Sequence, residues 1–179
     1  LFLDVRRLAA AGERLVGSRL DLLKCYDYQI PDLCVRVLRC PGFPSPIATV
    51  IRSFYSRRLV WFCLGRSVHP VAVRPRHGLL QGCPFSVLLL NGVMSMWIRA
   101  IRDAYPALRI GVCLDDRLLW AAGRGAICQV ADAFATSQSF DGSLNARLNE
   151  EKRFPFACAT PTARRFASAF PDWPSRRRG

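Results

Sequence analysis

The sequence predicts an α+β domain in which helices cover one face of an antiparallel sheet. Segments in which apolar and polar residues alternate, as in strands, are interspersed with segments whose apolar residues recur at helical spacing. The segments follow one another as strand, helices, hairpin, helix, hairpin and helix, and this order fits an antiparallel sheet. The chain has 179 residues, of which 51% are hydrophobic, so it is long enough to bury a core within one domain.

Three helices and one strand are predicted before the first hairpin. Residues 1–12 are expected to form a short helix, and residues 15–23 a strand. A helix over residues 31–39 begins with a proline, which suits a first turn, and another helix covers residues 47–55. The alternation in the strand puts its apolar and its charged positions on opposite sides, with Leu20 and Leu22 facing one way and Arg19, Asp21 and Leu23 the other.

Two hairpins and two longer helices are predicted in the rest of the chain. The first hairpin joins residues 59–64 and 68–73 through a glycine-containing turn. A long helix follows from Pro84 to about Pro106, and an amphipathic helix covers residues 127–141. Between the two helices, the second hairpin has adjacent carboxylates at its tip. Alternation predicts that Ile110, Val112 and Leu114 point to the core and that Gly111, Cys113 and Asp115 point away from it.

These elements predict one domain over residues 1–160 and a loosely ordered basic tail over residues 161–179. The segment from Pro155 onward is rich in proline and carries little periodic signal, and the tail ends in a run of three arginines. The chain begins with leucine, so we expect a fragment or a processed product.

The charge predicts a polyanionic partner. The net charge is +13, and the basic residues are two lysines and 24 arginines. Nucleic acid is a better candidate than a membrane, because no long basic amphipathic helix is evident and the longest apolar run, residues 87–98, is too short and too interrupted to span a bilayer. The eight cysteines contain no Cys-x-x-Cys pair, so we expect buried, reduced thiols in an intracellular protein, either nuclear or cytoplasmic, and no zinc site. Nothing in the sequence indicates an oligomeric state.

The acidic residues suggest a metal site. Asp21 and the Asp115-Asp116 pair lie at the ends of predicted strands, on faces away from the core. If those strands are neighbours, the three carboxylates repel one another, and two Mg²⁺ ions roughly 3.5 to 4 Å apart would relieve the repulsion and create a phosphoryl-transfer site. Mn²⁺ is the alternative ion. An isolated Asp-Asp pair is more often an ordinary turn, which is the competing interpretation.

Four motifs in sequence order resemble those of reverse transcriptases of the non-LTR retrotransposon and group II intron type. Residues 21–27, DLLKCYD, resemble the first palm motif, and residues 77–86, HGLLQGCPFS, resemble the second. Residues 113–116, CLDD, stand where the family has an aromatic, any residue and two aspartates, and residues 148–152, LNEEK, resemble the next motif. The resemblance covers residues 19–153 and implies a polymerase palm with most of the fingers and the thumb missing.

The resemblance also implies a role for each matching residue. Asp21, Asp115 and Asp116 would be the catalytic acids and, with the Leu22 carbonyl, the metal ligands. Tyr26 would lie under the sugar of the incoming nucleotide and exclude a 2′-hydroxyl, which favours DNA synthesis. The remaining substrate-binding residues would be Gln81 and Gly82 beside the nucleotide and template, and Lys152 near the triphosphate.

Other interpretations of these residues remain open. Tyr26 could pack under the sheet, Gln81-Gly82 could be a plain turn before a helix, and Lys152 could be solvated. Cys113 replaces the family's aromatic residue, Leu80 its proline and His77 its arginine, which alters the surroundings of the primer end and of the nucleotide.

The function expected from the resemblance is RNA-directed DNA synthesis. Two metal ions would transfer nucleotides from deoxynucleoside triphosphates to a primer 3′-hydroxyl on an RNA or DNA template. Little or no activity is expected from the isolated chain, because most of the parts that position primer and triphosphate would lie outside it. The alternative is an inactive, degenerate domain of the same origin that only binds nucleic acid. A third possibility is an unrelated basic domain, in which Asp21 and Asp115 would lie far apart.

Overall fold

The computed structural model describes residues 6, 7, 10–12, 15–158, 162, 164, 165 and 168. The chain divides into two compact units, one formed by residues 1–23 and 94–179 and the other by residues 24–93. The predicted helix over residues 1–12 and the predicted tail over residues 161–179 lie largely outside the described residues.

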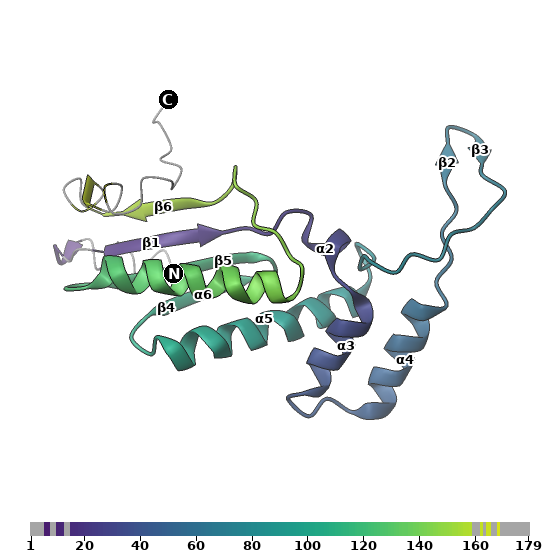
Figure 1. Ribbon diagram of the computed structural model, residues 1–179, viewed down its shortest axis with the longest axis horizontal. Helices are drawn as coiled ribbons and strands as arrows, with labels where there is room; N and C mark the ends of the chain where they lie inside the picture. The colour runs from purple at the N-terminus through teal and green to yellow at the C-terminus, as the bar shows by residue number, and fades with distance from the viewer. Residues whose placement is uncertain are drawn as a thin grey trace. The chain divides into compact units, whose positions relative to one another are not determined.

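The first unit is built on a four-stranded antiparallel sheet with the strand order β4-β5-β1-β6 (Figure 1). The strands are β1 (Leu15–Leu20), β4 (Arg109–Cys113), β5 (Asp116–Ala122) and β6 (Phe154–Ala157). Helix α6 (Ala126–Ser143) and the second half of α5 (Pro84–Ala104) pack on one face of this sheet. The predicted fold class, α+β with helices on one face of an antiparallel sheet, is confirmed.

The core of this unit lies between the sheet and these two helices. Alternate residues of β1 and β5 point into it, and helical spacing places apolar side chains of α5 and α6 opposite them. The buried set includes Val16, Leu20, Trp97, Ile101, Leu119, Ala121, Val130 and Ala133. By length and composition alone α5 could cross a membrane, but a core helix meets the same criterion, and Leu89, Leu90 and Trp97 are fully buried.

The second unit consists of helices and an exposed ribbon. The helices of this unit are α2 (Cys25–Tyr28), α3 (Pro31–Arg39), α4 (Ser45–Ser56) and the first half of α5. Gly92 of α5 has no side chain, which leaves room for the Leu38 side chain of α3. The predicted hairpin is present, but its ladder is limited to β2 (Cys63–Leu64), β3 (Ser67–Val68) and a bridge between Val60 and Val73. Pro70 has no backbone N–H to continue the ladder, which explains the shorter strands.

Three predictions from the sequence are wrong. Strand β1 ends at Leu20, three residues before the predicted end. Pro155, which the sequence placed in a proline-rich segment with little periodic signal, lies in β6, because β6 is an edge strand where a missing N–H is tolerated. Of the eight cysteines, all of them free thiols, only Cys25 and Cys34 are buried, and burial raises the pKa of the Cys34 thiol to about 12.

Gly17 of β1 is required by its cross-strand neighbour. Phe156 lies directly opposite Gly17, and a Cβ at Gly17 would overlap the Phe156 ring and approach the Leu119 carbonyl oxygen to 2.7 Å. We expect Gly17→Ala to lower the free energy of unfolding by about 1–3 kcal/mol, as overpacking does. Gly142, near the end of α6, has open space at its Cβ position, so Gly142→Ala should raise the free energy of unfolding by up to about 1 kcal/mol. Urea unfolding measures the free-energy change of each variant. Equal changes for Gly17→Ala and Gly142→Ala would contradict the close approach at Gly17.

Candidate active site

The predicted acids Asp21, Asp115 and Asp116 lie at one end of the two central strands of the first unit. Leu20 pairs with Arg117 in the β1–β5 register, so Asp21 and Asp116 are the next residues of their strands at the same end. Cys113 of β4 pairs with Asp116, which leaves Leu114 and Asp115 as the two residues of the hairpin turn. The carboxylates therefore come from a strand end, a turn and a strand start.

Leu114 changes the direction in which the turn residues point. Its φ is +56°, a left-handed conformation that costs a residue with a Cβ about 1–2 kcal/mol, so the alternation of β4 stops at Cys113. The prediction that Leu114 points to the core is wrong on that account, since Leu114 is 37% exposed. Backbone strain in a turn of this kind is often associated with a functional site.

The Asp115 carboxyl is electrostatically coupled to the other two acids. Its pKa is raised above the ordinary value, first by burial and then by the negative charges of Asp21 and Asp116, while Lys152 acts in the opposite direction. Asp21 therefore lies within electrostatic reach of Asp115, whereas an unrelated basic domain would hold the two far apart. This crowding of like charges is the situation that a bound cation relieves.

Asp21 is held by the segment that resembles the fourth motif. Its side chain is only 8% exposed, and the Asn149 amide donates a hydrogen bond to Asp21 Oδ2 at 3.3 Å. The Asn149 backbone N–H also donates to the Asp21 carbonyl oxygen at 2.8 Å. Lys152 Nζ lies 3.4 Å from Asp21 Oδ2 and its side chain is 64% exposed, so Lys152 neutralises Asp21 and still reaches solvent. The Asn149 contact was absent from the sequence-based prediction, although Asn149 lies inside the quoted motif.

Asp116 has a cation of its own. Arg19 donates from Nε and Nη2 to Asp116 at 2.7 to 3.0 Å, and the two side chains are 37% and 42% exposed. The sequence placed Arg19 on the side of the strand that carries Asp21, but gave no signal for this pairing. The contact is half-exposed, so another cation can reach Asp116. Because Arg19 already donates to the carboxylate, that cation must displace Arg19 or share the carboxylate with it.

The Leu22 carbonyl oxygen takes no part in the hydrogen bonds that join Leu22 to its neighbouring strand segment. Leu22 forms an isolated antiparallel bridge with Leu148, and the hydrogen bonds of that bridge are made by the residues on either side. In such a pair the carbonyl of the bridging residue points away from its partner, here toward the side of β1 on which β5 lies.

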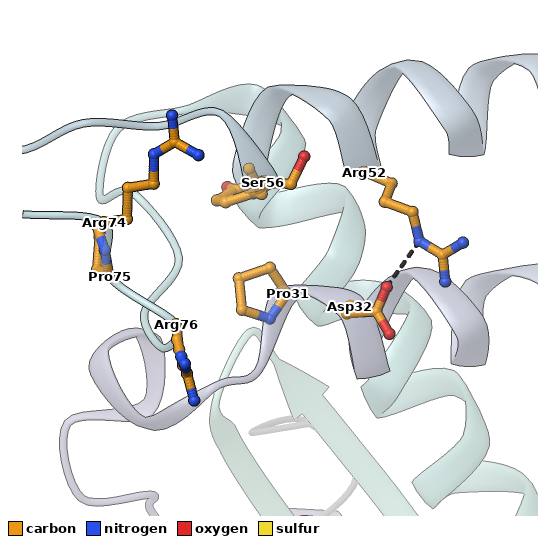
Figure 2. Close-up of a pocket in the computed structure, with 8 residues that line it drawn as sticks. Pro31, Asp32, Arg52, Ser56, Arg74, Pro75 and Arg76 are labelled. Carbon is orange, nitrogen blue, oxygen red and sulfur yellow. Dashed lines mark hydrogen bonds and ion pairs between the residues drawn. The ribbon is translucent and has the colours of Figure 1, made fainter.

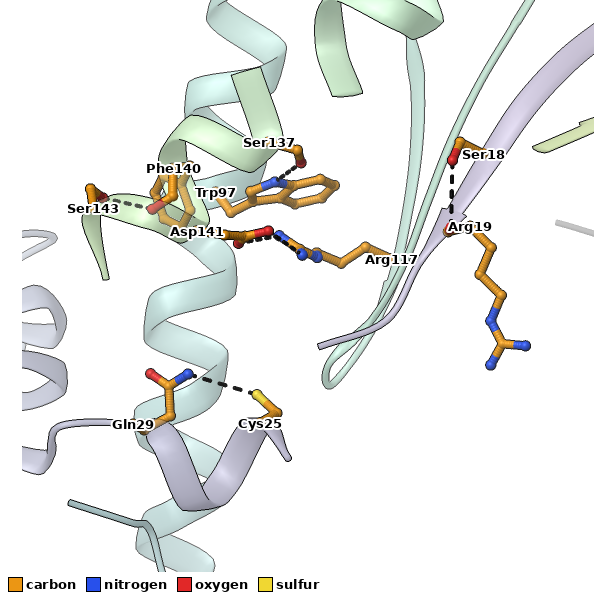
Figure 3. A network of polar contacts seen from close by, with 10 residues as sticks. All are labelled: Ser18, Arg19, Cys25, Gln29, Trp97, Arg117, Ser137, Phe140, Asp141 and Ser143. Carbon is orange, nitrogen blue, oxygen red and sulfur yellow. Dashed lines mark hydrogen bonds and ion pairs between the residues drawn. The ribbon is translucent and has the colours of Figure 1, made fainter. Parts of the chain in front are cut away.

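Behind the acids, a second ion pair anchors the start of β5 (Figure 3). The guanidinium of Arg117 is fully buried and donates to both carboxylate oxygens of Asp141 on α6, at 2.8 and 2.7 Å. It lies 5.0 Å from the ring centroid of Trp97, whose indole N–H donates to the Ser137 hydroxyl. Asp116 and Arg117 are consecutive, so an ion pair on each face of the sheet fixes the strand that follows Asp115.

The other predicted site residues belong to the second unit. Tyr26 of α2 accepts the Leu79 N–H at its carbonyl oxygen, at 2.7 Å, which ties α2 to the loop before α5. Gln81 and Gly82 are exposed and form a turn closed by the Cys83 N–H and the Leu80 carbonyl oxygen, with a φ of +82° at Gly82. Buried Ser86 holds this turn by donating to the Leu80 carbonyl oxygen at 2.6 Å.

The donor set fits a hard divalent cation in part. Asp21, Asp115 and the Leu22 carbonyl supply oxygen atoms, which Mg²⁺ prefers. The pKa of Asp115 is raised first by burial and then by the charges of Asp21 and Asp116, and a bound cation would offset both effects. Across the described part of the chain, however, no three or more His, Cys, Asp or Glu side chains are arranged so that they could hold a metal ion. Asp116 is instead engaged by Arg19.

The charge on Asp115 should make the protein less stable at neutral pH. A carboxyl whose pKa is higher in the folded than in the unfolded state favours folding at low pH, and this contribution is lost as the pH rises through the folded pKa. We therefore expect Asp115→Asn to raise the midpoint of thermal unfolding at pH 7 and to change it less at pH 3, where Asp115 is protonated. Calorimetry of the wild type and the variant at the two pH values measures these midpoints. A lower midpoint for Asp115→Asn than for the wild type at pH 7 would show that the Asp115 charge does not destabilise the fold.

Comparisons with known proteins show the fold of this chain. The sequence matches no protein-family description and no curated protein. The structure is similar to parts of three telomerase structures. Telomerase from Candida tropicalis in complex with the TWJ fragment of telomeric RNA has a TM-score of 0.64 and 13% identity over 87% of this chain. Apo telomerase from Candida tropicalis, truncated from its C-terminal domain, has a TM-score of 0.59 and 16% identity over 87%. Telomerase from Candida albicans in complex with the TWJ fragment has a TM-score of 0.61 and 14% identity over 85%.

The similarity assigns the fold and no more than the fold. This chain covers 28%, 34% and 28% of the three telomerase chains, in the same order. The α+β architecture, with helices on one face of an antiparallel sheet, is therefore that of a palm-like fragment, the fold that the four motifs predicted.

Proposed function

We propose that this chain is the palm of a reverse transcriptase and adds deoxynucleotides to a primer 3′-hydroxyl on an RNA or DNA template. The observation that carries the proposal is the electrostatic coupling of Asp115 to Asp21 and Asp116 at the end of two neighbouring central strands. The four ordered motifs and the palm-like fold support it. Divalent cations, Mg²⁺ or Mn²⁺, would activate the primer hydroxyl and stabilise the leaving oxygen.

Each site residue of the first unit would have its own role in nucleotide transfer. Asp21, Asp115 and the Leu22 carbonyl would hold the cations, and Asn149 orients the Asp21 carboxylate by its hydrogen bond at 3.3 Å. Lys152 is exposed beside Asp21, where its ammonium group would stabilise the charge of a triphosphate or donate a proton to the leaving group. Asp116 would join them when Arg19 releases it.

In the second unit, the proposal rests on the motifs. The Tyr26 ring would exclude a ribose 2′-hydroxyl, and the Gln81-Gly82 turn would approach the incoming nucleotide with its exposed backbone. The preferred partners are therefore a primed template and deoxynucleoside triphosphates.

Primer extension tests the proposal. The full chain is incubated with a primed RNA template, deoxynucleoside triphosphates and Mg²⁺, and extended primer is expected in an amount that falls to background when a chelator removes the cation. Extension that proceeds equally well with a chelator, or without a template, would overturn it.

A second candidate function is nucleic-acid binding without synthesis. Two observations favour binding without synthesis: Arg19 donates hydrogen bonds to both carboxylate oxygens of Asp116, and the net charge is +13. Salt-sensitive binding of the primed template without extension, equal in Asp115→Asn, would identify this function instead.

A further inference from the structure

Most of the second unit lies in a long stretch of sequence, residues 33–102, that contains no acidic residue. None occurs among the 70 residues between Asp32 and Asp103, whereas ten arginines do. These arginines are Arg36, Arg39, Arg52, Arg57, Arg58, Arg66, Arg74, Arg76, Arg99 and Arg102. A stretch of this composition has almost no internal counter-charges, so its positive potential extends into solvent.

Three of these arginines, Arg52, Arg74 and Arg76, line a pocket of about 470 Å³ (Figure 2). Arg74 and Arg76 lie on one side of it, and the ion pair of Arg52 Nε with Asp32, at 2.6 Å, lies on the other. Asp32 is the one acid that lines the pocket, and it also forms an ion pair with Arg36 at 3.4 Å. Arg74 and Arg76 form no ion pair with any residue that the structure describes, so the pocket has two cationic groups ready for an anion.

A ribbon arm, defined as residues 59–73, leads directly into this pocket. Val60 and Val73 exchange two backbone hydrogen bonds of 2.9 Å at its base, and the Phe62 carbonyl accepts the His69 N–H at 2.8 Å farther along. Every residue from 61 to 71 is exposed. Arg74 follows the arm at its base, and Arg66 lies in the turn at its tip, next to β3.

The arm also exposes aromatic rings. Trp61 is 49% exposed and Phe62 is 64% exposed, although both are residues that normally seek burial. Exposed rings flanked by arginines are the combination with which proteins bind single-stranded nucleic acid, because bases stack on the rings while arginines contact the phosphates.

We propose that the arm and the Arg74–Arg76 pocket of the second unit form a binding site for single-stranded nucleic acid. Phosphate groups are held by Arg74 and Arg76, and a base stacks on Trp61. The inference rests on the proposed function only in sharing a nucleic acid as the partner. It assigns the contact to residues that have no part in nucleotide transfer.

The apolar residues of the arm also raise the possibility of a protein partner. Leu64, Val68 and Val71 are 87%, 59% and 60% exposed, as in a protein interface. The charge decides between the partners. Arg74 and Arg76 have no ion-pair partner among the described residues, and a phosphodiester chain supplies anions at regular intervals.

Fluorescence anisotropy with the full chain tests the site. The probe is a labelled oligothymidylate of about 15 nucleotides, and a duplex of the same length serves for comparison. Arg74→Gln/Arg76→Gln should lower the affinity about tenfold or more and reduce the slope of log K against log salt by about 1.4, the value for two phosphate contacts on a single strand. Trp61→Leu should lower single-strand affinity about tenfold and change duplex affinity little, because paired bases cannot stack on the ring.

The control removes the same charge elsewhere. Arg99 and Arg102 are exposed on α5, and Arg99→Gln/Arg102→Gln should leave the affinity within about twofold of the wild type. Equal losses of affinity in the two double variants would show that the pocket is not the binding site. Unchanged single-strand affinity in Trp61→Leu would show that no base stacks on Trp61, and the exposed arm would then be assigned to a protein contact. Oligonucleotide binding is measured without triphosphates and without extension, so a failure of primer extension leaves this result unaffected.

Discussion

Replacing Asp141 with asparagine is expected to lower the free energy of unfolding by about 3–5 kcal/mol, because it leaves a buried guanidinium without its counter-charge. The Arg117 side chain is fully buried and that of Asp141 is 4% exposed. Burial raises the pKa of the Asp141 carboxyl, while the hydrogen bonds and the charge of Arg117 oppose that rise. An asparagine at this position keeps the shape but turns one hydrogen-bond acceptor into a donor facing Arg117.

Two variants separate the charge effect from general damage to α6. Asp132 is exposed on the same helix, and Asp132→Asn should change the free energy of unfolding by no more than about 0.5 kcal/mol. The double variant Arg117→Met/Asp141→Leu replaces both charges by apolar groups and should be close to the wild type in stability or above it. Urea unfolding at pH 7 gives all four values, and a double variant as unstable as Asp141→Asn would show that packing, rather than the unpaired charge, accounts for the loss.

The sequence predicted most of the elements because their signals are local. Helix α3 has the predicted bounds, since a proline opens it and Pro41-Gly42 follows it. Helix α5 was predicted from the spacing of its apolar residues, and the adjacent acids were predicted at a hairpin tip because both flanking segments have strand character. Strand β6 was missed because its pairing with β1 spans more than 130 residues and its proline argues against a strand.

The candidate site shows the same difference between local signals, which the sequence contains, and contacts between distant segments, which it does not. The sequence identified Asp21 and Asp115 through motifs, and strand pairing then brings them to the same end of the sheet. The partners of the acids could not be predicted in this way. Arg19 reaches Asp116 only because β1 and β5 are neighbours, and the positive φ of Leu114 follows from closing a two-residue turn with no glycine in it.

Asp21→Asn and Asp115→Asn are each expected to slow nucleotide addition by about 10³-fold or more. A carboxylate that holds a catalytic cation contributes several kcal/mol to stabilising the transition state, and each 1.4 kcal/mol corresponds to a factor of ten. Asn149→Ala should cost about 10- to 100-fold, because Asn149 orients Asp21 without holding the cation itself. Single-turnover primer extension with saturating template measures these rates.

The controls for this prediction come from the charges of the same unit. Asp132→Asn removes an equal charge from an exposed helical position and should leave the rate unchanged. Asp115→Asn relieves repulsion from Asp21 and Asp116, so its thermal midpoint should be no lower than that of the wild type, which separates lost chemistry from lost folding. If Asp115→Asn retained more than about a tenth of the wild-type rate, Asp115 would not be a catalytic ligand, since a loss below tenfold corresponds to less than about 1.4 kcal/mol. Arg19 would then neutralise an acidic turn whose role is structural.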